Sequence, residues 1–142
     1  MKLTVEKGDI FDINDLEVYY AHCISADFAL GAGIAVQFNK RYNMRHRLKL
    51  MYPNGPGYGS KSIVIDNVFN LVTKQRCYYK PTLESLTKAV KEMRKQCDEL
   101  RVKKLVMPKI GCGLDRLNWE DVQAIIEKTF ADSDIEIIVR FL

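Results

Sequence analysis

Two segments of the chain contain glycines, which would allow their backbone to approach an anion closely. The first, Gly31-Ala32-Gly33-Ile34, begins a predicted helix a few residues after Ser25. The second, Lys109-Ile110-Gly111-Cys112-Gly113-Leu114, follows a predicted buried strand. Exposed amides and a helix N-terminus both favour a phosphate group. Either segment alone is also compatible with a plain helix start or a tight turn, but two of them at neighbouring strand ends predict a pyrophosphate site.

Lys80 and Asp115 are the candidate reactive side chains. Lys80 lies where a strand region gives way to a predicted helix, and Asp115 directly follows the second glycine segment. A lysine at a helix N-terminus is disfavoured as an ammonium ion, which favours the neutral amine that a Schiff-base nucleophile requires. The alternatives are a solvated lysine before a helix and an aspartate paired with Arg116 or Arg101.

Three further features have a structural interpretation beside the functional one. Asp9 follows Gly8 at a strand end, where it either caps a turn or binds the exocyclic amine of an adenine. His22 lies inside an apolar strand, so we interpret it as a core histidine. The pairs Tyr19-Tyr20 and Tyr78-Tyr79 are assigned to the core or the rim, and one of them is a candidate wall of a nucleoside pocket.

The cysteines and histidines do not form a metal-binding pattern. Cys23, Cys77, Cys97 and Cys112 are scattered, with no C-x-x-C pair and only two histidines in the chain. Structural zinc sites use closely spaced pairs of ligands. We therefore predict no metal site and no cofactor, and we expect the four cysteines to be buried free thiols.

The elements that must position these residues alternate between strands and helices. Strands are predicted at 3–6, 19–24, 62–66, 68–72, 105–107 and 135–141, and helices at 31–42, 44–51, 81–100 and 119–130. The strands at 62–66 and 68–72 form either a hairpin through Asp66-Asn67 or one bulged edge. Short apolar strands joined by helices predict a mixed, mostly parallel sheet covered on both faces. The expected fold is one three-layer α/β/α domain over residues 1–142, with its functional loops at the carboxyl ends of the strands.

Composition and charge exclude several classes of protein. The chain has 142 residues, of which 47% are hydrophobic and 28% charged, and no apolar run is long enough to span a membrane. The N-terminus alternates between polar and apolar residues like a strand and lacks the apolar core of a signal peptide, which predicts a cytoplasmic protein, or a nuclear one in a eukaryote.

The net charge is +4, and no Asp or Glu occurs between Phe28 and Ile65. This basic segment indicates either a solvated helix face or a surface beside a polyanion.

Several of these motifs together resemble the macrodomain family. The resemblance rests on residues 8–11 (Gly-Asp-Ile-Phe), 21–25 (Ala-His-Cys-Ile-Ser), 31–35 (Gly-Ala-Gly-Ile-Ala), 80–82 (Lys-Pro-Thr) and 107–119, and it extends from Met1 to Leu142. Within the family the chain resembles the branch of terminal ADP-ribose protein glycohydrolases that are also described as O-acetyl-ADP-ribose deacetylases. Commoner macrodomains carry an Asn-Ala-Ala-Asn-like segment and three glycines where this chain has His22-Cys23-Ile24-Ser25 and Gly31-Ala32-Gly33.

The resemblance implies a role for each candidate residue. Lys80 would be the nucleophile and Asp115 the proton acceptor, in an enzyme that removes ADP-ribose from protein carboxylates and deacetylates O-acetyl-ADP-ribose. The adenine would be held by Asp9 and Ile10, and Leu142 would lie against the adenosine end. Ser25 and the segment Gly31, Ala32, Gly33 and Ile34 would bind the phosphates and the distal ribose. The segment that begins at Lys109 would wrap the pyrophosphate with Ile110, Gly111, Cys112, Gly113 and Leu114.

Other functions remain open at this stage. The expected partners are ADP-ribose and ADP-ribosylated protein, and the expected state is a monomer that binds no membrane. One alternative is removal of ADP-ribose from DNA bases, for which the basic segment would be the nucleic-acid path. Another is a non-catalytic ADP-ribose reader, and a phosphatase acting on ADP-ribose phosphate is a weaker third.

Overall fold

A six-stranded sheet forms the middle of the molecule. The computed structural model describes all 142 residues, and its strands are β1 (Lys2–Lys7), β2 (Tyr19–Ser25), β3 (Lys61–Ile65), β4 (Val68–Lys74), β5 (Lys104–Met107) and β6 (Glu136–Phe141). The strand order is β1-β6-β5-β2-β4-β3, and all neighbours are parallel except β3 and β4. The predicted mixed, mostly parallel sheet is confirmed, and the strands at 61–65 and 68–74 form the hairpin rather than a single edge.

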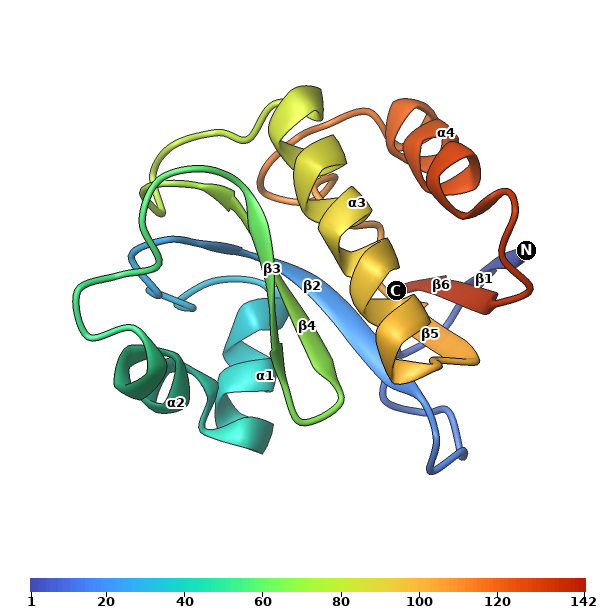
Figure 1. Cartoon of the computed structure of the whole chain (residues 1–142), viewed down its shortest axis with the longest axis horizontal. Coiled ribbons are helices and arrows are strands. Elements are labelled where there is room, and N and C mark those ends of the chain that lie inside the picture. The colour runs from blue at the N-terminus through green and yellow to red at the C-terminus, as the bar shows by residue number, and fades with distance from the viewer.

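Two helices cover each face of this sheet, as Figure 1 shows. The helices are α1 (Ile34–Tyr42), α2 (Met44–Met51), α3 (Leu83–Leu100) and α4 (Trp119–Phe130). One core cluster contains Phe38 of α1 and Met44 and Leu48 of α2, all with fully buried side chains. The other contains the apolar faces of α3 and α4. The arrangement is a three-layer α/β/α fold.

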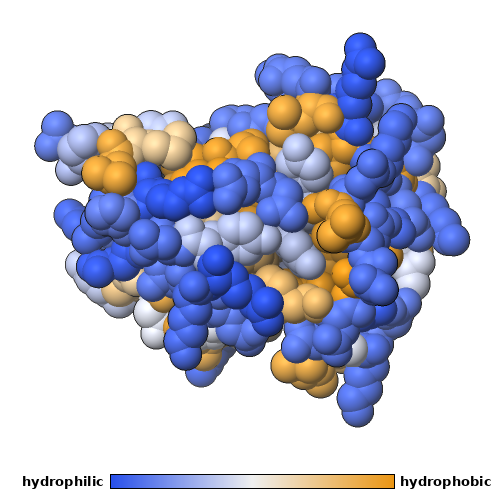
Figure 2. Space-filling view, turned by 90° about the horizontal axis from the view of Figure 1, so that it is seen from below, coloured by the Kyte–Doolittle hydropathy of each residue, from blue (hydrophilic) through white to orange (hydrophobic).

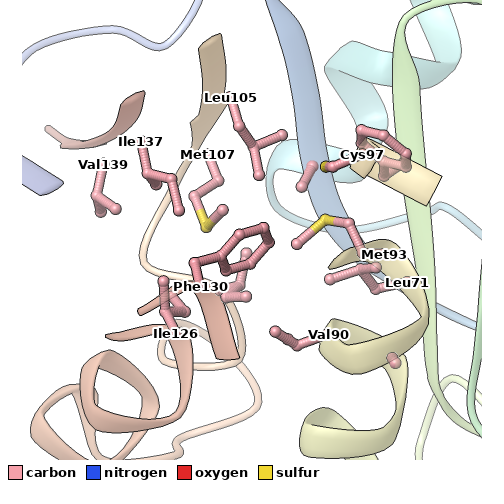
Figure 3. Close-up of a cluster of buried hydrophobic side chains, with 14 of the residues drawn as sticks. Leu71, Val90, Met93, Cys97, Leu105, Met107, Ile126, Phe130, Ile137 and Val139 are labelled. Carbon is pink, nitrogen blue, oxygen red and sulfur yellow. The ribbon is translucent and has the colours of Figure 1, made fainter. Parts of the chain in front are cut away.

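The core between the sheet and α3 and α4 follows from the alternation of strand side chains. Alternate residues of a strand point to the same face, so every second apolar residue of β5 and β6 meets the helices. Figure 3 shows the side chains that meet there, including Leu105 and Met107 of β5, Ile137 and Val139 of β6, Val90 and Met93 of α3, and Ile126 and Phe130 of α4. This core fixes the strand ends from which the loops of the site depart.

Capping residues decide where α3 and α4 begin. Asn118 accepts hydrogen bonds from the backbone N–H groups of Glu120 and Asp121, which confirms it as the N-cap of α4. The predicted helix start at Pro81 is wrong, because Thr82 caps α3 by accepting from the Ser85 N–H, so the helix begins at Leu83. Lys80 therefore lies outside the first turn of α3.

The predicted helix start at Gly31 is also wrong. The α1 helix begins only at Ile34, and Gly33 is its N-cap with φ 60° and ψ −147°. This conformation is rarely adopted by residues with a Cβ atom, so glycine is required there and the chain before Ile34 stays non-helical. Residues 31–33 are consequently a loop whose backbone is exposed.

The surface seen from below the view of Figure 1 is mostly polar. Figure 2 shows that this face is largely hydrophilic and that hydrophobic residues appear on it in separate patches. Exposed apolar side chains of the molecule include Leu50 of α2, Tyr78 and Leu114. None of the helices combines the length and the apolar character required to span a membrane.

Candidate functional site

A cavity of about 670 Å³ lies at the carboxyl ends of β2, β4 and β5. Twelve of the sixteen site residues predicted from the sequence line it: Ser25, Gly31, Ala32, Gly33, Ile34, Lys80, Lys109, Ile110, Gly111, Gly113, Leu114 and Asp115. They come from three loops that are far apart in the sequence. The parallel strands bring these loops to one edge of the sheet, as expected for an α/β fold.

The start of α1 is built to receive an anion. No side chain caps this helix, and its first turn contains no acidic residue. The first amides of a helix have no partner within the helix, and the helix dipole places positive charge at this end. Because Gly33 and Ile34 line the cavity, the free N–H groups of this turn can donate to a phosphate there.

Lys80 reaches across the cavity to the second glycine loop. Its Nζ atom donates a hydrogen bond to the Leu114 carbonyl oxygen, at 2.8 Å. This contact joins the loop after β4 to the loop after β5 and places the amine beside the residue that precedes Asp115. Lys80 has no carboxylate partner, since its only hydrogen bond is to a neutral carbonyl group.

Asp115 has a partner that the sequence did not suggest. Its Oδ1 atom lies 2.6 Å from Nζ of Lys74, the last residue of β4, and the two side chains are only 15% and 14% exposed. The alternative pairing with Arg116 or Arg101 is not formed. Lys74 also lines the cavity, so it is a site residue that sequence reasoning missed.

Asp27 is a second residue that sequence reasoning missed. Its carboxylate accepts hydrogen bonds from the Ser25 hydroxyl, from the Ala29 N–H at 3.2 Å and from the Cys77 N–H at 2.9 Å. Partial burial alone would raise the pKa of Asp27, but these hydrogen bonds outweigh burial and lower it. Asp27 thereby ties the loop after β2 to the loop that carries Lys80.

The cysteines of the site differ in exposure. All four are free, as predicted, but only Cys97 is fully buried and Cys77 is exposed, because its loop lies at the mouth of the cavity. Burial, followed by the nearby Asp115 charge, raises the pKa of Cys23 to about 12. Its thiol therefore stays protonated at neutral pH and is a poor nucleophile. No group of three or more His, Cys, Asp and Glu side chains is arranged to hold a metal ion.

Four predicted site residues do not line the cavity: Asp9, Ile10, Cys112 and Leu142. Asp9 caps a turn by accepting from the Phe11 N–H, Ile10 is buried, and the Cys112 thiol donates to the Ile110 carbonyl group. Leu142 is exposed and follows β6.

One contact links the last residue of β6, Phe141, to a residue that lines the cavity. The Lys109 Nζ atom, from a residue that lines the cavity, lies 4.2 Å from the centre of the Phe141 ring, next to Leu142. The end of β6 therefore lies beside the cavity.

The basic segment between Phe28 and Ile65 is largely engaged within the molecule. Arg47 pairs with Asp66, Arg45 donates to the Phe28 carbonyl group and Lys61 to that of Pro56, while Arg41 lies over the Phe11 ring. Lys40 and Lys49 have no such contact. Only Arg47 among these side chains has a carboxylate partner, so most of the positive charge of the segment is not neutralised within the molecule.

Comparisons with known proteins give consistent results. A family model for the Macro domain matches residues 56–126. The ADP-ribose glycohydrolase OARD1 of Homo sapiens is 40% identical over 144 residues, which cover 99% of this chain and 92% of the relative, and the Bos taurus protein matches equally well. Among solved structures, the macrodomain of Mycobacterium tuberculosis DarG has a TM-score of 0.87 at 23% identity, with 97% of this chain and 96% of that chain covered. The macrodomain of Thermus aquaticus DarG has a TM-score of 0.84 at 21% identity, covering 99% and 98%.

Proposed function

The chain belongs to the macrodomain family, and on that premise we propose that it is an ADP-ribose glycohydrolase. Its substrates are ADP-ribose attached to protein carboxylates and, in a related reaction, O-acetyl-ADP-ribose. The relatives that are 40% identical over nearly the whole chain are named for this activity. The observation that carries the proposal is the contact of Lys80 with the 114–115 backbone at a cavity flanked by two glycine loops.

The diphosphate binds between the two glycine loops. The free amides at the start of α1 contact one phosphate, and the backbone around Gly111 and Gly113 contacts the other. The adenosine extends past Lys109 toward Asp9, Ile10 and Leu142, while the distal ribose points toward Lys80. This orientation places the bond to be cleaved at the mouth of the cavity, where Lys80 is exposed and an attached protein has room.

Lys80 carries the first chemical step. Its neutral amine attacks the anomeric carbon of the distal ribose, and a C–N bond forms as the C–O bond to the carboxylate breaks. The carboxylate leaves with the bonding electron pair and takes the proton that Nζ loses. Water then adds to the same carbon, Asp115 accepts a proton from this water, and it passes that proton to Nζ as the C–N bond breaks. The products are free ADP-ribose and the unmodified enzyme.

Substitution of Lys80 tests this mechanism. Arginine stays protonated and is a poor nucleophile, so Lys80→Arg and Lys80→Ala both lose turnover and keep ADP-ribose binding. Asp115→Ala keeps the attacking amine and turns over slowly, which leaves one ADP-ribose on Lys80. In its ring-opened form the adduct is an imine, which borohydride reduces to a stable amine, and peptide mass spectrometry then locates it. Lys91→Ala on the exposed face of α3 is the matched control.

Three results would contradict parts of this proposal. Full activity of Lys80→Ala removes the covalent mechanism. Loss of activity in Asp115→Ala without an adduct places Asp115 in the first step instead of the second. Binding of ADP-ribose without turnover by the unmodified protein, on ADP-ribosylated protein, ADP-ribosylated DNA and O-acetyl-ADP-ribose, identifies a reader.

A second candidate substrate is ADP-ribosylated DNA. Tyr78 and Tyr79 are 74% and 49% exposed and lie edge to face beside Lys80, with ring centres 5.0 Å apart. Arg76 is exposed in the same acid-free loop. Aromatic rings with neighbouring cations are the groups on which single-stranded bases stack. Faster release of ADP-ribose from DNA than from protein, reduced by Tyr78→Ala, would favour this substrate.

A further inference from the structure

Three lysines, Lys74, Lys80 and Lys109, line the cavity, and only Lys74 has a carboxylate partner. Lys74 pairs with Asp115 at 2.6 Å, whereas Lys80 donates only to the neutral Leu114 carbonyl group. A lysine paired with a carboxylate is held as an ammonium ion, and an ammonium ion has no electron pair with which to attack. The distribution of partners therefore distinguishes Lys74, which is bound to a carboxylate, from Lys80, whose amine has no counter-ion.

The local backbone aims Lys74 at this position. The parallel pairing of β2 with β4 runs from Tyr20 and Val68 to Ile24 and Val72, and then skips Thr73 so that Ser25 pairs with Lys74. Such an irregularity redirects the side chains beyond it. The Lys74 side chain is 14% exposed and lines the cavity. Water therefore has little access to the Asp115 carboxylate in place of the Lys74 ammonium group.

Resting on the glycohydrolase function proposed above, we infer that Lys74 is a positioning residue that occupies Asp115 and so keeps Lys80 without a counter-ion. Lys74 does not touch the reacting atoms. It holds the carboxylate through Oδ1, and Oδ2, which has no hydrogen-bond partner in the protein, is left to accept a proton. Without Lys74, Asp115 would pair with Lys80, whose Nζ atom already lies at the Leu114 carbonyl group next to Asp115, and stabilise its unreactive form. Lys109 is directed elsewhere, with its Nζ atom 4.2 Å from the centre of the Phe141 ring.

Other titratable and charged groups around Lys80 do not perform this role. Those facing the cavity are Cys23 of β2, Lys109 of the loop after β5, and Cys77 and Tyr78 of its own loop. The Asp27 carboxylate, which accepts from the Cys77 N–H, is already occupied by three donors. Asp115 is thus the one carboxylate at the cavity that can move from one lysine to the other.

The pH dependence of turnover separates this role from a merely structural one. The proposed attack by Lys80 requires a neutral amine, so we expect kcat to rise with pH. Lys74→Gln can still donate a hydrogen bond to Asp115 but has no charge. In the Lys74→Gln variant we expect the rising part of the plot of kcat against pH to move to higher pH by about one unit. The kcat of this variant near pH 7 then falls about tenfold. Lys74→Arg keeps the charge and therefore the pH dependence of the unmodified enzyme. The affinity for ADP-ribose changes less than about threefold in both variants, because the predicted contacts with the diphosphate come from other residues.

A direct titration makes the test independent of the stability of the variants. Nuclear magnetic resonance of labelled lysine side chains follows the Lys80 amine in the unmodified protein, in Lys74→Gln and in the control Lys91→Gln, which lies on α3. A higher midpoint for Lys80 in Lys74→Gln alone supports the inference. An unmoved midpoint and pH profile in an active enzyme overturn it and leave the proposed function intact, whereas an unmodified protein that is inactive on all three substrates overturns both.

Discussion

His22 is a buried titratable residue that the proposed chemistry does not use. Its Nε2 atom lies 2.6 Å from the Asn70 Oδ1 atom, and its ring stacks on Phe38 with centres 4.1 Å apart. Burial lowers the pKa of His22 to about 4, although the hydrogen bond with Asn70 acts in the opposite direction. The histidine is therefore neutral in the folded protein, which confirms its assignment to the core.

This lowered pKa predicts a loss of stability in mild acid. The unfolded chain binds a proton at His22 near pH 6.5, whereas the folded chain does so only near pH 4. The free energy of unfolding therefore falls by about 1.4 kcal/mol per pH unit across this window, about 3 kcal/mol in total. Urea unfolding of the unmodified protein and of His22→Gln between pH 7 and pH 4 measures the contribution.

The His22→Gln variant lacks this pH dependence of the free energy of unfolding, whatever the stability of the variant at pH 7. The exposed His46 serves as the matched control, because His46→Gln leaves the slope unchanged. Aspartates with a lowered pKa, such as Asp27, lose their contribution only below their ordinary value of 3.8. An equal slope in the unmodified protein and in His22→Gln would contradict the assignment.

At the scale of elements, the start of α1 depends on the backbone conformation of one glycine. Gly33 has φ +60°, and a Cβ atom there would meet Leu114 Cδ1 only at 3.8 Å, so the penalty for a larger residue comes from the backbone rather than from a collision. Gly33→Val is expected to cost about 1–3 kcal/mol in stability and to abolish ADP-ribose binding, because the helix start moves. Calorimetric titration with ADP-ribose measures the loss.

A neighbouring glycine offers the control. Gly31 also lines the cavity, but its φ is not in the left-handed region and its added Cβ would meet only the Ala29 carbonyl oxygen, at 3.8 Å. Gly31→Ala should keep both stability and binding. Normal binding by Gly33→Val would show that the amides of α1 do not hold the diphosphate.

The link between two loops through Asp27 gives a further prediction. Asp27→Ala removes an acceptor shared by three donors, two of them backbone N–H groups. We expect a loss of about 1–3 kcal/mol in stability and faster amide hydrogen exchange at Ala29 and Cys77. Protection should stay unchanged at Leu105 in the sheet. Unaltered exchange at Cys77 would mean that the loop is held by other contacts.

The sequence predicts local features of this site better than long-range ones. The bounds of α2 and α4 are predicted correctly because Asn118 and the apolar spacing are readable within one element. The pairing of Lys74 with Asp115 is not predictable in this way, since it joins residues 41 positions apart and depends on an irregularity in β4. The contact of Asp27 with Cys77 spans 50 positions. Only the assembled sheet brings such pairs together.

At the scale of the whole molecule, ligand binding and folding are linked. A ligand that binds only the folded state stabilises it, by about 2.7 kcal/mol at 100 times its Kd. ADP-ribose should raise the melting temperature by several degrees in differential scanning fluorimetry. AMP should raise it less at the same concentration, because it lacks the second phosphate and the distal ribose. Equal shifts for the two ligands would contradict a cradle made by two glycine loops.

The strand order has a consequence for how the protein is synthesised. β1 pairs only with β6, from Lys2 with Glu136 to Lys7 with Phe141, so the first strand made has no partner until the sixth has left the ribosome. β6 must then enter between β1 and β5. Contacts between such distant segments slow folding, and unpaired strand edges invite association with other chains. During translation the edges of β1 and β5 are therefore the surfaces that a chaperone would have to protect.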